Sequence, residues 1–197
     1  LWVAAYPQPS ITHSSTDPPN PPSLSSGPWK EWAIWQYSGN GTVAGIGNGI
    51  DLDVLAMSLE EFTGKASSTP AQAAESQSSE SNAVTPASSG SPQIGLDVSD
   101  DVGSVDWPSV KSQGYDFAYI KVSGGYSNNY STYLDQEFPS NWPGTKSAGL
   151  QRGAYHFFDL MGSGEDQAKT FLDQVDKYGG YEKDDLPPVL DVEWTTT

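Results

Sequence analysis

The segment Leu186-Pro-Pro-Val-Leu-Asp-Val-Glu-Trp194 has the pattern of a short buried strand that ends in two acidic residues. It is the last of four apolar, strand-like runs in the second half of the chain, and helix-like runs separate these strands. Such alternation is typical of an α/β protein with a parallel sheet. The predicted strands span residues 94–99, 115–123, 152–158 and 186–193, and the predicted helices span residues 107–113, 135–148 and 164–177.

The first 63 residues add three strand-like runs, at residues 1–6, 32–38 and 49–53, followed by a short helix at residues 54–62. Seven strands are one fewer than a closed parallel barrel requires. We therefore expect an α/β fold of the (β/α)8 or TIM-like barrel type that is incomplete, with about seven strands.

Residues 64–92 differ sharply in composition from the segments on either side. They are rich in Ser, Thr, Pro and Ala, and Val84 is their one large apolar residue. Such a stretch cannot bury enough surface to offset its conformational entropy. We therefore predict a disordered linker between a segment 1–63 and a segment 93–197.

Composition argues against several classes of partner and cofactor. The net charge is −16 with only nine Lys and Arg, which disfavours nucleic acid. The chain has no cysteine and two histidines, so no metal site and no cofactor is expected. No apolar run of 18 residues exists, so no membrane contact is expected. The Ser- and Pro-rich linker, with glycosylation triplets at Asn40 and Asn129, favours an extracellular protein.

Carboxylates gather at the predicted strand ends. Asp191 and Glu193 are two residues apart and point the same way on a strand, so each disfavours ionisation of the other. A glycoside hydrolase needs such a pair, although a solvated strand end has the same pattern. Asp97 and Asp51 also follow apolar runs, although Asp97 could simply cap a turn. Of Asp51 and its neighbour Asp53, we expect one to be an ordinary surface residue.

Several motifs resemble one known family. Ile94-Gly-Leu-Asp-Val-Ser99, Gly153-Ala-Tyr-His-Phe-Phe158 and the 186–193 run resemble the N-terminal half of glycoside hydrolase family 25, the N-acetylmuramidases of Chalaropsis type. Leu1-Trp-Val-Ala-Ala-Tyr6 and Trp32-Ala-Ile-Trp-Gln-Tyr-Ser38 resemble its C-terminal half. The halves stand in reversed order, which fits either a piece of a tandem-domain protein or a circular permutant. Seven strands and a long linker favour the tandem piece, with a second catalytic domain in the parent chain.

The resemblance implies a chemistry and roles for the acids. The implied reaction cleaves the β-1,4 bond between N-acetylmuramic acid and N-acetylglucosamine in bacterial cell-wall peptidoglycan. Glu193 aligns with the general acid, and Asp191 would stabilise positive charge at the sugar or orient its acetamido group. Asp97 and Asp51 would tune this pair and hold substrate or water. Retention, inversion and substrate assistance stay open, because carboxyl separations decide between them.

Several further side chains are candidates for binding a sugar. Aromatic rings stack on pyranose faces, and an amide can hydrogen-bond an acetamido group. For any single aromatic residue core packing is the stronger interpretation, and a satisfied interior residue is at least as good an interpretation of the histidine as direct catalysis. The candidates are Tyr155, Tyr6, Trp35, Gln36, Tyr37 and His156.

Two other functions fit parts of the pattern. A chitinase-like glycosidase also ends a barrel strand in an Asp-x-Glu pair, but Pro188, Val189 and Leu190 replace the alternating aspartates that precede that pair in chitinases. A catalytically dead carbohydrate-binding fragment fits the incomplete barrel, but all the expected acids are present. With one strand missing, we expect the chain alone to be weakly active or inactive.

Overall fold

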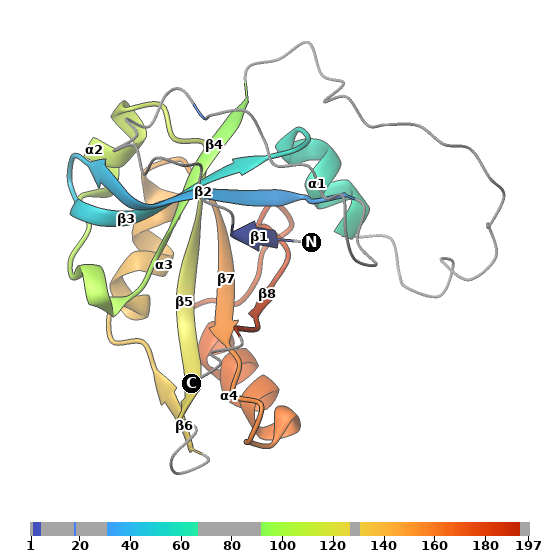
Figure 1. The fold of residues 1–197 in the computed structure, drawn as a ribbon. Coiled ribbons are helices and arrows are strands. Elements are labelled where there is room, and N and C mark those ends of the chain that lie inside the picture. Colours follow the sequence, from blue (N-terminus) through green and yellow to red (C-terminus); the bar gives the residue numbers. More distant parts are fainter. Residues whose placement is uncertain (1, 5–17, 19–30, 67–91, 127–130, 194–197) are drawn as a thin grey trace, which may run out of the picture.

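A computed structural model describes residues 2–4, 18, 31–66, 92–126 and 131–193. In this part of the chain eight strands form one sheet, shown in Figure 1, with the order β1-β2-β3-β4-β5-β7-β8 and β6 paired to β5. The strands are β1 (Trp2–Ala4), β2 (Ile34–Val43), β3 (Gly47–Leu55), β4 (Gln93–Val98), β5 (Phe117–Tyr126), β6 (Ser131–Leu134), β7 (Gln151–Phe157) and β8 (Val189–Asp191).

The second segment forms the parallel half of the sheet, as predicted. β4, β5, β7 and β8 pair in parallel, and each predicted strand of this segment is present. β8 is shorter than predicted because Pro187 and Pro188 precede it, and proline has no N–H to donate to a ladder. The strand therefore begins at Val189 and ends at Asp191, and Glu193 lies beyond it.

The first segment breaks the parallel pattern, so the prediction of a parallel barrel is wrong here. β2 and β3 form an antiparallel hairpin, and β3 pairs antiparallel with β4. The connection from Val43 to Gly47 is far too short for the crossover that parallel strands need. Gly45 takes a φ of 89° in this turn, a conformation that favours glycine. β1 and β8 are the two ends of the sheet, which is not closed, and the fold is a mixed α/β fold.

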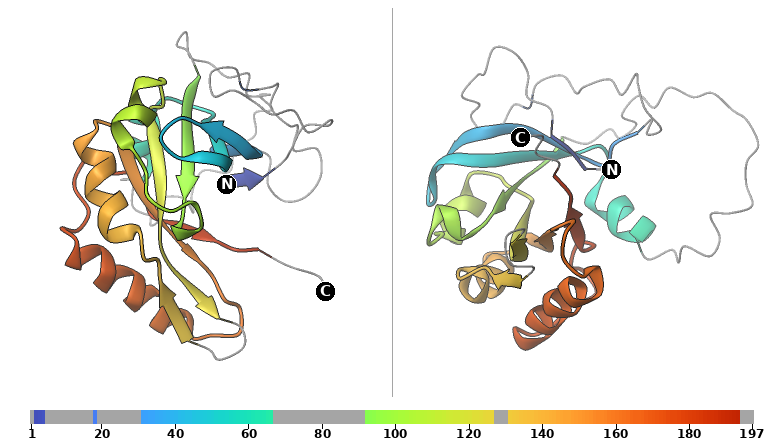
Figure 2. Two further views of the ribbon diagram at one scale, coloured as in Figure 1. Left: turned by 90° about the vertical axis from the view of Figure 1, so that its left-hand side faces the viewer. Right: turned by 60° about the horizontal axis from the view of Figure 1, so that its bottom comes forward.

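Three helices cover one face of the sheet, as Figure 2 shows: α2 (Trp107–Ser112), α3 (Phe138–Ser147) and α4 (Gly164–Lys177). Their buried apolar side chains join those of the strands in the larger core. α4 begins and ends as predicted, and Ser163 caps its first turn by accepting a hydrogen bond from the Asp166 N–H. Phe171 and Val175 of this helix are buried, whereas Leu172 is exposed.

Other helix boundaries shift for local reasons. α3 begins at Phe138 because the carboxylate of Asp135 accepts hydrogen bonds from the backbone N–H groups of Glu137 and Phe138. The helix predicted at residues 54–62 is α1 (Leu59–Ala66), because β3 continues to Leu55. Ser58 and Glu61 form a reciprocal capping box at its start.

The predicted linker lies mostly outside the described residues, since residues 67–91 are not described. Its first three residues belong to α1 instead. β6, which no sequence pattern indicated, is a four-residue strand that forms a hairpin with β5. None of the helices in the described ranges is long and apolar enough to cross a membrane.

A smaller core lies on the opposite face of the sheet, around Phe117, Tyr119 and Tyr155. Two glycines make room for the aromatic rings of β5. A Cβ atom at Gly95 would lie 2.2 Å from the Phe117 ring, and one at Gly153 would lie 2.2 Å from the Tyr119 ring. This face carries the candidate site.

Candidate active site

A cleft of about 1040 Å³ opens on the face of the sheet that α2, α3 and α4 leave uncovered. Its walls come from both segments of the chain: from β1, β2 and β3 on one side, and from β4, β5, β7 and the 187–193 stretch on the other. Five acids line it. Four of them are sequence-predicted, namely Asp51, Asp97, Asp191 and Glu193, and the fifth is Asp101.

Asp51 and Asp97 face each other across the junction of the two segments. They are direct partners in the antiparallel ladder of β3 and β4. Side chains of such partners point to the same face, with Cβ atoms about 4.5–5.5 Å apart. Forty-five residues separate the two acids in sequence (97 − 51 − 1 = 45), so only the pairing of the segments brings them together.

Asp53 corrects one expectation. It lies two residues beyond Asp51 on the same strand and therefore points to the same face. It is fully buried, with 0% of its surface exposed, and is not an ordinary surface residue. Asp51 is only half-buried. The strand thus places one acid at the cleft and a second acid beneath it.

Asp191 and Glu193 approach the other two acids from β8. Burial raises the pKa of Asp191 to about 6, the charge of Glu193 adds to the rise, and Lys121 opposes it. Burial also raises the pKa of Asp51 to about 6, where a hydrogen bond from Gln36 opposes the rise and the charge of Glu193 increases it. Acids from β3 and from the end of β8 therefore influence the ionisation of one another.

Asp97 and Asp53 have the most strongly perturbed carboxyl groups. Burial raises the pKa of Asp97 well above its usual range, and the charges of Asp53, Asp51 and Asp191 raise it further. Burial likewise raises the pKa of Asp53, with the charge of Asp51 adding to it. The cleft therefore holds both protonated and ionised carboxyl groups near neutrality, as acid–base catalysis requires.

Comparison with known proteins matches the second segment to one family model, "Glycosyl hydrolases family 25", over residues 96–197. The chain belongs to glycosyl hydrolase family 25. The matched part contains Asp97, Asp191 and Glu193 of this family 25 chain, whereas Asp51 lies outside it. The resemblance to this family is confirmed for the second segment, whereas the resemblance of segment 1–63 and the reversed order of the halves stay predictions.

Curated relatives of this family 25 chain match about half of it or less. "Lysozyme M1" of Streptomyces globisporus is 43% identical over 102 residues, 50% of this chain and 32% of that protein. "Autolytic lysozyme" of Clostridium acetobutylicum is 38% identical over 63 residues, 32% of this chain and 18% of that protein. The chain thus spans about a third or less of the length of these relatives.

Two solved structures are also similar to part of this chain. A family 25 glycosyl hydrolase from Bacillus anthracis is 35% identical, with a TM-score of 0.45, and the match covers 52% of this chain and 43% of that one. The bacterial lysozyme from Streptomyces coelicolor is 42% identical, with a TM-score of 0.41, and the match covers 49% of this chain and 42% of that one.

Two of the sugar-binding candidates line the cleft of this family 25 chain. Gln36 lies at the cleft and its amide hydrogen-bonds Asp51. Tyr155 also lines it, with 8% of its surface exposed. Tyr6 lies outside the described residues.

Three other candidates need correction, because the structure places them away from the cleft. Trp35 and Tyr37 are buried in the core on the helix-covered face. His156 is buried between Ser123 and Gln167, 2.8 and 2.9 Å from its ring nitrogens. Gln167 Oε1 also accepts from the Asp159 N–H, so the Nε2–H of the imidazole donates to it and Nδ1 accepts from Ser123. Burial lowers the pKa of His156, which is a satisfied interior residue.

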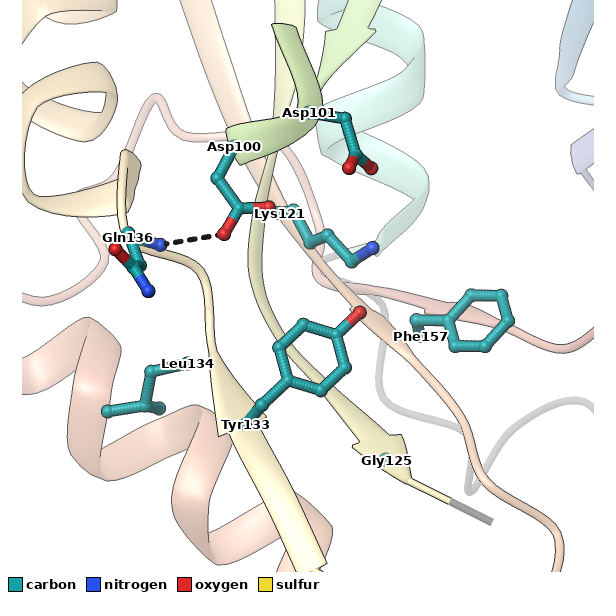
Figure 3. A pocket seen from close by; sticks show the side chains of 8 residues that line it. All are labelled: Asp100, Asp101, Lys121, Gly125, Tyr133, Leu134, Gln136 and Phe157. Atoms are coloured by element: carbon teal, nitrogen blue, oxygen red, sulfur yellow. Dashed lines mark hydrogen bonds between the residues drawn. The ribbon is translucent and has the colours of Figure 1, made fainter. Parts of the chain in front are cut away.

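Lys121 is a cleft residue that sequence reasoning missed. It lies on β5, and among the described residues that line the cleft it is the one cation. Its ammonium group lies 5.4 Å from the ring centre of Tyr133 and 5.3 Å from that of Phe157. It also lines an adjoining pocket of about 530 Å³, drawn in Figure 3. Its position near the predicted end of a parallel strand was the available signal. It was missed because only acids were sought at strand ends.

Proposed function

We propose that this chain is the catalytic part of a secreted peptidoglycan hydrolase, a lysozyme of N-acetylmuramidase type. The observation that carries this proposal is the meeting of Asp51, Asp97, Asp191 and Glu193 in one cleft. Membership of family 25 supports it, as do the two relatives named as lysozymes. The proposed substrate is the bacterial wall polymer, and no cofactor takes part.

The proposed roles follow the resemblance and fit the geometry. Glu193 is exposed at the cleft and donates a proton to the glycosidic oxygen that leaves. Asp191 is half-buried beside it and stabilises the positive sugar or orients the acetamido group. Asp51 and Asp97 hold the substrate or water, and Gln36 and Tyr155 contact the sugar. The cleft of about 1040 Å³, lined from Trp2 to Glu193, is the proposed binding site of the polymer.

The two segments act as one unit in this proposal. Segment 1–63 supplies the C-terminal part of a family 25 catalytic domain and segment 93–197 its N-terminal part, joined by residues 64–92. The ladder between β3 and β4 supports this reading, because it joins the two segments in a single sheet.

Digestion of purified bacterial walls tests the function. Products with N-acetylmuramic acid at the reducing end are expected, and Glu193→Gln should lower the rate by about a hundredfold or more, since it removes the general acid. Glu165→Gln, on the exposed first turn of α4, is the matched control and should leave the rate unchanged. Cleavage of chitin instead of walls would select the chitinase-like function. Wall binding without turnover, unaffected by Glu193→Gln, would select a binding module.

A further inference from the structure

Asp53 is a buried acid that the proposed reaction does not use directly. It does not line the cleft, and none of its surface is exposed. No donor of the described residues is placed to hydrogen-bond either oxygen of its carboxyl group, and Oδ2 of the neighbouring Asp97 has no partner either. The polar side chains that act most directly on the pKa of Asp53 are the indole of Trp2 and the carboxyl groups of Asp97 and Asp51. A buried acid with so few donors needs a physical reason to be tolerated.

The contact with Asp97 supplies that reason. Asp97 is half-buried and lines the cleft, whereas Asp53 lies behind it, opposite Gly95 in the β3–β4 ladder. Two carboxylate ions repel, and they can hydrogen-bond each other only when one of them carries a proton. When the two carboxyl groups share one proton away from water, one buried charge is removed and a hydrogen bond forms between the groups.

The surroundings favour the shared proton from every side. Asp53 faces Asp51 on its own strand and the phenol of Tyr119 on β5, and Asp97 also faces Asp51 and Asp191. All of these groups are acidic. The cation of the cleft, Lys121, acts on Asp191. Trp2, which also acts on the pKa of Asp53, packs on Tyr119 with ring centres 5.0 Å apart.

We propose that Asp53 is a positioning residue: it shares one proton with Asp97, and this hydrogen bond holds the Asp97 carboxyl group toward the cleft. The proton belongs to the pair rather than to either residue. Asp53 does not touch substrate and acts through Asp97. This inference rests on the proposed function, because it gives Asp97 a fixed orientation for a bound sugar.

Two variants of the full chain separate this role from simple packing. Asp53→Asn keeps the size and supplies an amide donor to Asp97, so wall digestion should stay within about threefold of wild type. Asp53→Leu fills the space but cannot hydrogen-bond, and should lose about tenfold or more, the usual effect of deleting a hydrogen bond to a charged group. Asp173→Asn, an exposed acid on α4, is the control for the amide change. Equal activity of Asp53→Leu and wild type overturns the proposal.

A titration that needs no turnover gives the second readout. In the chain labelled with carboxyl-13C aspartate, assigned with Asp53→Asn and Asp97→Asn, one proton should remain on the pair at about pH 7. In Asp53→Asn, Asp97 should ionise at lower pH, because a neighbouring charge is gone and a donor has replaced it. Two ionised groups at neutral pH in wild type, or an unchanged Asp97 titration in the variant, overturn the inference. If walls are not digested at all, the proposed function fails while this titration still decides the role of Asp53.

Discussion

At the residue scale, some carboxyl groups of the cleft lower the stability of the folded chain. The pKa of Asp51 and of Asp191 rises to about 6 on folding, mainly through burial. A carboxyl group with a raised pKa in the folded state favours folding less as it ionises. The resulting loss of unfolding free energy is absent below the unfolded pKa of about 4, grows as pH rises, and is complete above about pH 6.

This cost predicts a trade between stability and activity. Asp51→Asn and Asp191→Asn should raise the melting temperature at pH 7 and leave it nearly unchanged at pH 4, while lowering wall digestion. Thermal unfolding at the two pH values measures this. Asp185→Asn serves as the opposite control, because Asp185 accepts two hydrogen bonds from buried Arg152 and its loss should destabilise the fold. A lower melting temperature for both cleft variants at pH 7 would contradict the assignment of burial as the main cause.

The residues of the site were predictable in part, for reasons that differ by residue. Asp97, Asp191 and Glu193 lie at or just beyond the carboxyl ends of parallel strands, which converge on one rim, so the strand pattern pointed to them. Asp51 lies inside the antiparallel strand β3, and the pairing of β3 with β4 brings it to the cleft. The aromatic candidates Trp35 and Tyr37 were wrong because the alternation of side chains along a strand was not applied to them. Gln36 faces the cleft, so its neighbours Trp35 and Tyr37 must face the opposite side of the sheet. Asp53 was misjudged for the same reason, since residues two apart share a face.

At the scale of elements, β4 is the strand on which the site depends, and Gly95 is its tightest point. The strand pairs with β3 on one side and β5 on the other, and carries Asp97. Gly95→Ala would press a Cβ into the Phe117 ring, which is fully buried and cannot move aside. We expect a loss of about 1–3 kcal/mol in unfolding free energy, measured by urea unfolding, together with weaker wall digestion.

Gly64→Ala is the matched control for this prediction. A Cβ at Gly64 meets no atom within 4 Å, and alanine favours the helix α1 in which it lies. This variant should be neutral or slightly more stable. Equal stability of the two variants would show that β4 has more room than its packing indicates.

Strands and helices were predicted correctly where hydrophobic runs are long. The prediction was wrong where the pairing partner sets the direction of a strand. The parallel strands of the second segment and helix α4 were located from periodicity alone. The direction of β3 was not, because strand direction depends on which neighbour it pairs with. The short link between Val43 and Gly47 carried that information. β6 has only four residues and leaves too weak a pattern to detect.

At the scale of the whole molecule, the two segments are held together by their shared sheet. Five residue pairs join β3 to β4, from Asp51–Asp97 to Leu55–Gln93, and side chains of both strands share the larger core. The covalent link between the segments adds only loop-closure entropy, which varies slowly with length. The sheet should therefore stay intact when the chain between the two segments is cut.

A protease site inserted between residues 70 and 85 tests this. After cleavage, the two pieces should elute together in size-exclusion chromatography and keep the wall-digesting activity that the uncut chain shows. Addition of denaturant should separate them, which serves as the control. Pieces that separate in buffer alone would show that β3 and β4 do not hold the segments, and would favour two independent halves.

The order of the four acids along the chain sets when the complete cluster can form. A ribosome releases them in the order Asp51, Asp97, Asp191 and Glu193, so Glu193 is the last of the four to emerge. Each shorter nascent chain lacks at least one of them, and the cluster is complete only once synthesis has passed Glu193.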